Sequence, residues 1–302
     1  MIGVPTSAGA FAPGQEQAPA ALREAGLVEM LGRAGIGVRD HGDREVWRWR
    51  PDREQRRAQN LGMVVDIVRD TARRVGEASR DGEVTLVLGG DCTVGIGTVA
   101  AHVGAGEPVG LVYFDSHADL NVPESVTEGA LDWMGMAHML GVPGAAPPLV
   151  EAGPRVPLLG PEEVLLFGWG PQQATAFERA QIEERGIARV TVDEVAAGPE
   201  AAGARARDRV EERGARLLVH FDVDVIDFTD TPMSENWGRN EGLSYAAAMR
   251  ALDVLLAAPQ LAALTITELN PDHIEQGANT LERFATALAD SLGRSLPSAR
   301  GR

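Results

Sequence analysis

The sequence predicts one three-layer α/β/α domain over residues 1–302, with a mainly parallel sheet as the middle layer. Short apolar runs, typical of buried strands, alternate along the chain with longer segments whose apolar residues recur at helical spacing. This alternation favours a parallel sheet covered by helices on both faces. A chain of 302 residues can form one large domain or two small ones. The Pro/Gly/Ala-rich stretch 142–160 is typical of a surface connection rather than a linker, so we expect one domain.

The predicted strands are short apolar runs, most of which end directly before a glycine or an acidic residue. In chain order they are residues 1–5, 84–88, 110–114, 164–167, 217–221 and 264–267. The predicted helices carry apolar residues three or four positions apart, as in Leu61, Val64, Val65 and Val68. They are residues 60–75, 94–103, 133–140, 174–185, 202–213 and 245–257, and the tail from Ser295 is expected to fray.

The composition limits the classes of partner. The chain has 44 acidic and 28 basic residues, a net charge of −16, which argues against a nucleic acid or an anionic membrane as partner and favours small or cationic ligands. The sequence contains no lysine, which excludes Schiff-base catalysis and the phosphate-binding Walker loop. A single cysteine excludes an internal disulfide, and no run of about 18 apolar residues occurs. We therefore expect a soluble cytoplasmic protein.

Three predicted strands lead into clusters of residues that can bind metals. The clusters are Gly90-Asp91-Cys92, Asp115-Ser116-His117-Ala118-Asp119 and Asp222-Val223-Asp224. In open parallel sheets, ligands bind outside the carboxyl ends of the strands. Alternation along an extended segment would place the side chains of each cluster on one face.

Carboxylates that converge in one cleft would repel each other unless cations neutralised them. One Asp-x-Asp sequence is most often a turn or a cap. Three clusters at the ends of three strands are harder to explain in that way. They favour a metal pair bridged by carboxylates, with imidazole and thiolate completing the coordination.

These motifs resemble those of the ureohydrolases, the family of arginase, agmatinase and formiminoglutamase. That family has Gly-Gly-Asp-His, Asp-Ala-His-x-Asp and Asp-x-Asp-x-x-Asp, and this chain has Gly89-Gly90-Asp91-Cys92, Asp115-Ser116-His117-Ala118-Asp119 and Asp222-Val223-Asp224-Val225-Ile226-Asp227. The segment Thr267-Glu268-Leu269-Asn270-Pro271 resembles the late Glu-x-Asn-Pro motif of the family. The first 27 residues also resemble its N-terminal strand and first helix, so the likeness covers nearly the whole chain.

The resemblance implies a cofactor of two Mn²⁺ ions. Asp115 and Asp222 would bridge the ions; Cys92 and Asp119 would complete one site, and His117 and Asp224 the other. Two such ions lower the pKa of a shared water toward neutrality. Asp119 would orient that water and pass a proton to the leaving amine. Glu268 would bind the guanidinium of the substrate, whose planar fork matches a carboxylate. Family members are commonly trimers or hexamers, which implies a homo-oligomer.

The chain departs from the family pattern at Cys92, where the family has histidine. A thiolate is a softer donor than imidazole, so Zn²⁺, Fe²⁺ or Co²⁺ become alternatives to Mn²⁺. In the expected substrate pocket Asn121 matches the arginase pattern, whereas Glu128 and Asp132 replace a serine and a histidine. Added carboxylates would repel an amino acid's carboxylate. The loop 233–237 after the last acidic motif is expected to line the substrate's path, and Trp237 in this loop is either a platform for the substrate or part of the packing of the loop.

The leading prediction is therefore a metal-dependent guanidino hydrolase that releases urea and an amine from a small guanidino substrate other than free L-arginine, for example a natural product. One alternative is hydrolysis of an N-hydroxyguanidine to hydroxyurea. An alternative of another class is an inactive binding subunit with the same fold. For His220, a role behind the metal ligands stays open.

Overall fold

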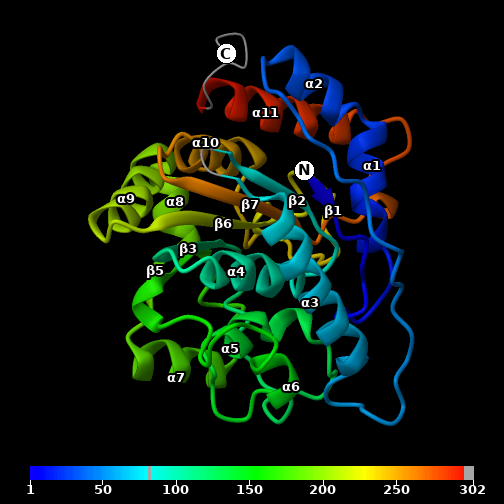
Figure 1. Ribbon diagram of the computed structural model, residues 1–302, viewed down its shortest axis with the longest axis vertical. Coiled ribbons are helices and arrows are strands. Elements are labelled where there is room, and N and C mark those ends of the chain that lie inside the picture. Colours follow the sequence, from blue (N-terminus) through cyan, green and yellow to red (C-terminus); the bar gives the residue numbers. More distant parts are fainter. Residues whose placement is uncertain (81–82, 296–302) are drawn as a thin grey trace.

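A parallel sheet forms the centre of the molecule in the computed structural model, which describes residues 1–80 and 83–295. Within these residues the sheet has seven strands in the order β1-β2-β7-β6-β3-β4-β5, and every pair of neighbours is parallel. Helices cover both of its faces (Figure 1). The predicted three-layer α/β/α fold is confirmed.

All six predicted strands form, and a seventh lies at the edge of the sheet. The strands are β1 (Ile2–Gly3), β2 (Thr85–Leu88), β3 (Val109–Phe114), β4 (Val164–Trp169), β5 (Ala188–Thr191), β6 (Arg216–Asp222) and β7 (Leu261–Thr267). The sequence pattern missed β5 because this edge strand is only partly buried and carries an arginine, so it lacks the apolar run of a central strand.

The helices lie in two groups on opposite faces of the sheet. They are α1 (Ala18–Glu24), α2 (Leu27–Arg33), α3 (Leu61–Ala78), α4 (Val94–Gly104), α5 (Gly135–Met139), α6 (Pro147–Val150), α7 (Ala176–Arg185), α8 (Val192–Ala197), α9 (Pro199–Glu212), α10 (Tyr245–Leu256) and α11 (Thr280–Ser295). Helices α3 and α4 lie on one face, and α10 and α11 lie on the other (Figure 1). Each group buries its apolar side chains against the sheet in its own hydrophobic cluster.

Helices α2, α6, α8 and α11 were not predicted, and α6 lies within the stretch 142–160 that we expected to be a surface connection. The amphipathic helix α11 continues to Ser295, so the rest of the tail that we expected to fray lies outside the described residues. In the part of the chain that the structure describes, no helix has the length and apolar character needed to cross a membrane.

The strand order explains how distant motifs meet. Strands β2, β7, β6 and β3 are consecutive neighbours, and all point in the same direction. Their carboxyl ends lead into Cys92, Glu268, Asp224 and Asp115, respectively. Because these ends lie side by side along one edge of the sheet, residues as far apart in the sequence as Cys92 and Glu268 are brought together.

Candidate metal and active site

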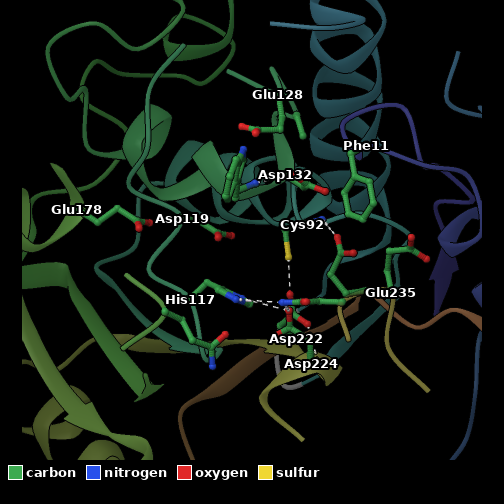
Figure 2. A pocket seen from close by; sticks show the side chains of 15 residues that line it. Phe11, Cys92, His117, Asp119, Glu128, Asp132, Glu178, Asp222, Asp224 and Glu235 are labelled. Carbon is green, nitrogen blue, oxygen red and sulfur yellow. Dashed lines mark hydrogen bonds and ion pairs between the residues drawn. The ribbon is translucent and has the colours of Figure 1, made fainter. Parts of the chain in front are cut away.

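A cavity of about 460 Å³ opens at the carboxyl ends of the central strands. Figure 2 shows its lining, which consists of Phe11, Cys92, His117, Asp119, Glu128, Ala130, Asp132, Trp133, Gln173, Glu178, Asp222, Asp224, Glu235, Asn236 and Glu268. Eight of these described residues are acidic, and none is arginine or lysine. Such a cavity favours cations, because each carboxylate stabilises positive charge and repels negative charge.

The turn after β2 places Cys92 in the lining of the cavity. A side chain at Gly90 would put its Cβ 1.7 Å from the carbonyl oxygen of Thr6, so the close passage of these two backbones requires glycine. Beyond the turn, the thiol of Cys92 donates to Oδ2 of Asp222 at 2.8 Å. Burial, followed by the charge of Asp222, raises the pKa of this thiol well above its usual value. A thiolate at this position therefore needs a cation beside it.

Three side chains surround the sulfur of Cys92 and complete a group of four possible metal ligands. Cys92, Asp115, His220 and Asp222 each offer one donor atom, and these atoms lie within 4.8 Å of one another. All four residues are buried. Their sulfur, nitrogen and oxygen atoms form a set that can coordinate a divalent transition metal.

A second group lies beside the first and shares Asp115 with it. Nδ1 of His117 is 3.3 Å from Oδ1 of Asp115 and 3.1 Å from Oδ2 of Asp224. Burial alone would lower the pKa of His117, but the carboxylates of Asp224 and Asp115 raise it well above its usual value. One donor atom from each of these three residues lies within 4.8 Å of the other two.

The charges of the two groups fit metal ions. Oδ2 of Asp115 is buried and has no hydrogen-bond partner within residues 1–80 and 83–295. Burial and the neighbouring charge of Asp224 raise the pKa of Asp115 to about 7. An orphaned carboxylate oxygen in such a place is costly unless a cation or water satisfies it. The two groups therefore fit a pair of divalent ions that share Asp115.

Asp119 lies in the cavity but outside both groups. Its Oδ2 accepts a hydrogen bond from the hydroxyl of Tyr113, and its backbone has a positive φ of 49°. Burial, and then the charge of Asp115, raise the pKa of Asp119 well above its usual value. Asp119 thus faces the same space as the two groups (Figure 2), while its role as a metal ligand stays a prediction.

Glu268 forms one wall of the cavity. Its Oε1 accepts from the backbone N–H of Cys92 at 2.9 Å, and its Oε2 accepts from Nε2 of Gln15 at 3.0 Å. Burial, followed by the charge of Asp132, raises the pKa of Glu268 well above its usual value. Each oxygen keeps further acceptor capacity for a ligand in the cavity.

Of the four residues predicted to bind substrate, two line the cavity and two do not. Glu128 and Asp132 line the cavity, but Asn121 is not part of its lining. Oδ1 of Asn121 accepts from Ser125 at 3.1 Å and from Thr175 at 2.9 Å. Trp237 is 63% exposed and also lies outside the lining.

Sequence reasoning missed several residues of the cavity. Nδ2 of Asn236 is 3.1 Å from Nε2 of His117 and 3.4 Å from Oδ2 of Asp224, so it holds both side chains. Phe11, 55% exposed, stands at the cavity wall on a loop far away in the sequence. Asn236 belongs to the loop 233–237, which the sequence suggested as a lining of the substrate's path without giving Asn236 a role of its own, whereas an isolated phenylalanine gives no such signal.

The comparisons with known proteins agree with this fold. The model of the arginase family matches residues 1–293. Arginase from Bacillus caldovelox is 30% identical over 295 residues, covering 97% of this chain and 96% of its own. Rat arginase-1 is 29% identical over 304 residues, covering 97% and 90%.

Solved structures extend the likeness to three dimensions. The crystal structure of arginase from Bacillus subtilis has a TM-score of 0.84 and 26% identity, covering 98% of both chains. Formimidoylglutamase from the same species, at 17% identity and a TM-score of 0.75, shares the fold. The predicted ureohydrolase resemblance is confirmed: this chain belongs to the arginase family, whose members are metal-dependent hydrolases of amidino carbon–nitrogen bonds.

Proposed function

We propose that this protein hydrolyses the guanidino group of a small compound other than free L-arginine and releases urea and an amine. The observation that carries the proposal is the lining of the cavity, where eight of the fifteen described residues are acidic and none is arginine or lysine. A guanidinium finds carboxylate partners on several sides. A substrate carboxylate finds no arginine or lysine there.

The chain's own residues suit a pair of Mn²⁺ ions, or of softer divalent metals. Cys92, Asp115 and Asp222 would hold one ion, and Asp115, His117 and Asp224 the other. When bound, such ions supply Lewis acidity that lowers the pKa of water and polarises the bond to be broken. The count and identity of the ions belong to the proposal, as do the sharing of Asp115 by both ions and the second bridge, through Asp222, that the resemblance implies.

Two carboxylates of the cavity would handle the substrate. Glu268 would accept hydrogen bonds from the N–H groups of the guanidinium, with its orientation fixed by Gln15 and by the backbone of Cys92. Asp119 would orient the attacking water and carry a proton to the leaving amine, because the Tyr113 hydroxyl holds its side chain toward the cavity. The raised pKa of Asp119 suits a group that must gain and lose a proton.

The tail of the substrate would lie along Glu128, Asp132 and Glu235. Glu128 is exposed, whereas Glu235 is buried against Asn270. These side chains disfavour a tail that ends in a carboxylate and favour an amine or a neutral polar group. The trimer or hexamer implied by the resemblance stays a prediction.

A urea-release panel tests the proposal. Guanidinobutyrate and agmatine both carry a guanidino group on a four-carbon chain, but one tail ends in a carboxylate and the other in an ammonium group. We expect kcat/KM to be at least about tenfold higher for agmatine than for guanidinobutyrate or L-arginine, which corresponds to about 1.4 kcal/mol.

The same panel includes hydroxyarginine, with hydroxyurea as a second readout, and larger guanidino natural products. Equal or better turnover of L-arginine would contradict the proposed specificity. Release of neither urea nor hydroxyurea from any compound, by protein with a full metal complement, would favour an inactive binding subunit.

A further inference from the structure

His220 lies among the candidate metal ligands but has no role in the proposed reaction. It is on β6, two residues before Asp222, so both side chains point to the same face of the sheet. The imidazole is buried, and its Nε2 is 3.4 Å from Sγ of Cys92. It belongs to the buried group of four donors that also includes Asp115.

The ring of His220 is fixed in orientation. It stacks on Tyr113 with a centroid distance of 4.3 Å and an interplanar angle of 12°. On its other edge, a Cβ at position 95 would lie 2.5 Å from Nδ1, so Gly95 leaves the space that the ring occupies. With Nδ1 turned toward helix α4, Nε2 is the nitrogen that faces Cys92.

The spacing of nitrogen and sulfur matches two ligands of one metal ion. A zinc ion binds sulfur at about 2.3 Å and imidazole nitrogen at about 2.0–2.1 Å, so the two donors of a tetrahedral site lie about 3.5 Å apart. The observed separation is 3.4 Å. The unpartnered Oδ2 of Asp115, buried in the same group within the described chain, is an independent sign that a cation is bound there.

We propose that His220 coordinates, through Nε2, the metal ion that Cys92 holds. That ion then has sulfur, imidazole nitrogen and the carboxylates of Asp115 and Asp222 as ligands. Sulfur and nitrogen donors favour Zn²⁺, Co²⁺ or Fe²⁺ over Mn²⁺. The inference concerns how the ion is bound and does not depend on which guanidino compound is the substrate.

The alternative role for His220 is a hydrogen bond without metal coordination. Its Nε2 also lies 3.1 Å from Oγ1 of Thr267, which in turn is 3.4 Å from Sγ of Cys92. An imidazole that only bonded Thr267 and Cys92 would orient the sulfur but would not enter the coordination sphere. Counting the imidazoles bound to metal distinguishes the two roles.

The test uses Zn²⁺ alone as probe and X-ray absorption spectroscopy as readout. Chelator-treated protein is loaded with Zn²⁺, and the ligands around zinc are counted. We expect one sulfur and two imidazoles per chain, the imidazoles being those of His117 and His220. His220→Phe keeps an aromatic ring on Tyr113 and should lose one imidazole while retaining the sulfur.

Binding affinity gives a second readout. Loss of a partner outside the coordination sphere typically costs 10–100-fold in metal affinity, so we expect His220→Phe to weaken one of the two zinc sites by more than about 100-fold. His102→Phe, a histidine in α4 outside the cluster, is the matched control and should bind both ions as the wild type does.

Two results would overturn the inference. One is a wild-type spectrum with a single imidazole per chain, a measurement that needs no variant to fold. The other is a folded His220→Phe protein that binds both ions with wild-type affinity and an unchanged imidazole count. Neither readout involves substrate, so a protein with the expected coordination that released no urea would contradict only the proposed function.

Discussion

Two residues whose side chains are proposed to act on the substrate have an unusual backbone conformation. Asp119 and Glu268 have φ angles of 49° and 61°, in the left-handed region that costs non-glycine residues about 1–3 kcal/mol. Backbone hydrogen bonds hold them there: the amide of Glu268 donates to Gly90, and the carbonyl of Asp119 accepts from Ala137. Strain of this kind persists when the surroundings fix a side chain in one direction, and both side chains face the cavity.

The charge of Glu268 is testable by Glu268→Gln, which keeps its shape. A hydrogen bond to a charged group contributes about 1.5–3 kcal/mol, so we expect kcat/KM for urea release to fall about 10–100-fold or more. Metal content, measured by elemental analysis, should stay at the wild-type level. Glu128→Gln, at an exposed position of the same cavity, is the control and should lose less activity. Loss of metal in Glu268→Gln would show that the carboxylate supports the metal site instead.

At the scale of elements, the loop after β6 depends on one aspartate. Asp227 accepts backbone N–H groups from Thr229, Glu241 and Gly242, at 2.8, 2.8 and 3.1 Å. These bonds close the loop that carries Glu235 and Asn236 into the cavity. The third aspartate of the Asp-x-Asp-x-x-Asp motif therefore shapes the site without lining it.

Helix α5 is held to the start of α6 by a neutral histidine. Nδ1 of His138 donates to the carbonyl of Met134 at 2.6 Å, and Nε2 accepts from the amide of Ala146 at 3.2 Å. Burial lowers the pKa of His138 from 6.5 to about 4. Between these pH values the unfolded chain binds a proton that the folded chain does not, so stability falls as pH drops from about 6.5 to about 4.

We expect His138→Gln to reduce this dependence of folding stability on pH. Between pH 7 and pH 5 the wild type should lose about 2 kcal/mol more of its free energy of unfolding than the variant, because one pKa unit corresponds to about 1.4 kcal/mol. Urea titrations at the two pH values measure the difference. Parallel losses in both proteins would mean that His138 is already charged in the folded state.

The elements show which features a sequence can predict. Central strands such as β3 and β6 are continuous apolar runs because helices cover both faces, and these runs are visible in the sequence. The edge strand β5 and the short helix α8 carry no such pattern, since much of their surface is exposed. Helix α11 does have an apolar stripe, and reading its pattern would have predicted it.

The residues of the candidate site likewise fall into those that the sequence could predict and those that it could not. Residues that directly follow strands, such as Asp115 and Asp224, were predictable because parallel strands end at one edge. Asn236 and Phe11 come from loops whose paths depend on distant contacts, as the bonds of Asp227 illustrate. Asn121 fits a motif, yet Ser125 and Thr175 hold its carbonyl outside the cavity lining. A motif identifies the residue, but packing decides what its side chain reaches.

At the scale of the whole molecule, the net charge of −16 and the acidic cavity predict that bound metal ions stabilise the fold. Each ion that binds only the folded chain adds about 2.7 kcal/mol when its free concentration is 100 times its dissociation constant. Two ions would thus add about 5 kcal/mol, and a chain of this size gains roughly 2–4 °C in Tm per kcal/mol. We expect chelation to lower Tm by about 10 °C or more.

The fall in Tm that chelation causes should depend on pH. Without a cation, Asp115 has a folded pKa raised to about 7 against an unfolded value of 3.8, so folded protein holds a proton that unfolded chain releases. Stability of the chelated protein therefore falls as pH rises from about 4 to about 7, and the effect of chelation on Tm should be larger at pH 8 than at pH 5. Scanning calorimetry with and without chelator, followed by re-addition of Zn²⁺, Mn²⁺ or Mg²⁺, measures both effects. Zn²⁺ should restore Tm and Mg²⁺ should not, because Mg²⁺ prefers oxygen ligands. A Tm that chelator leaves unchanged at both pH values would mean that the buried carboxylates are neutralised by protons alone.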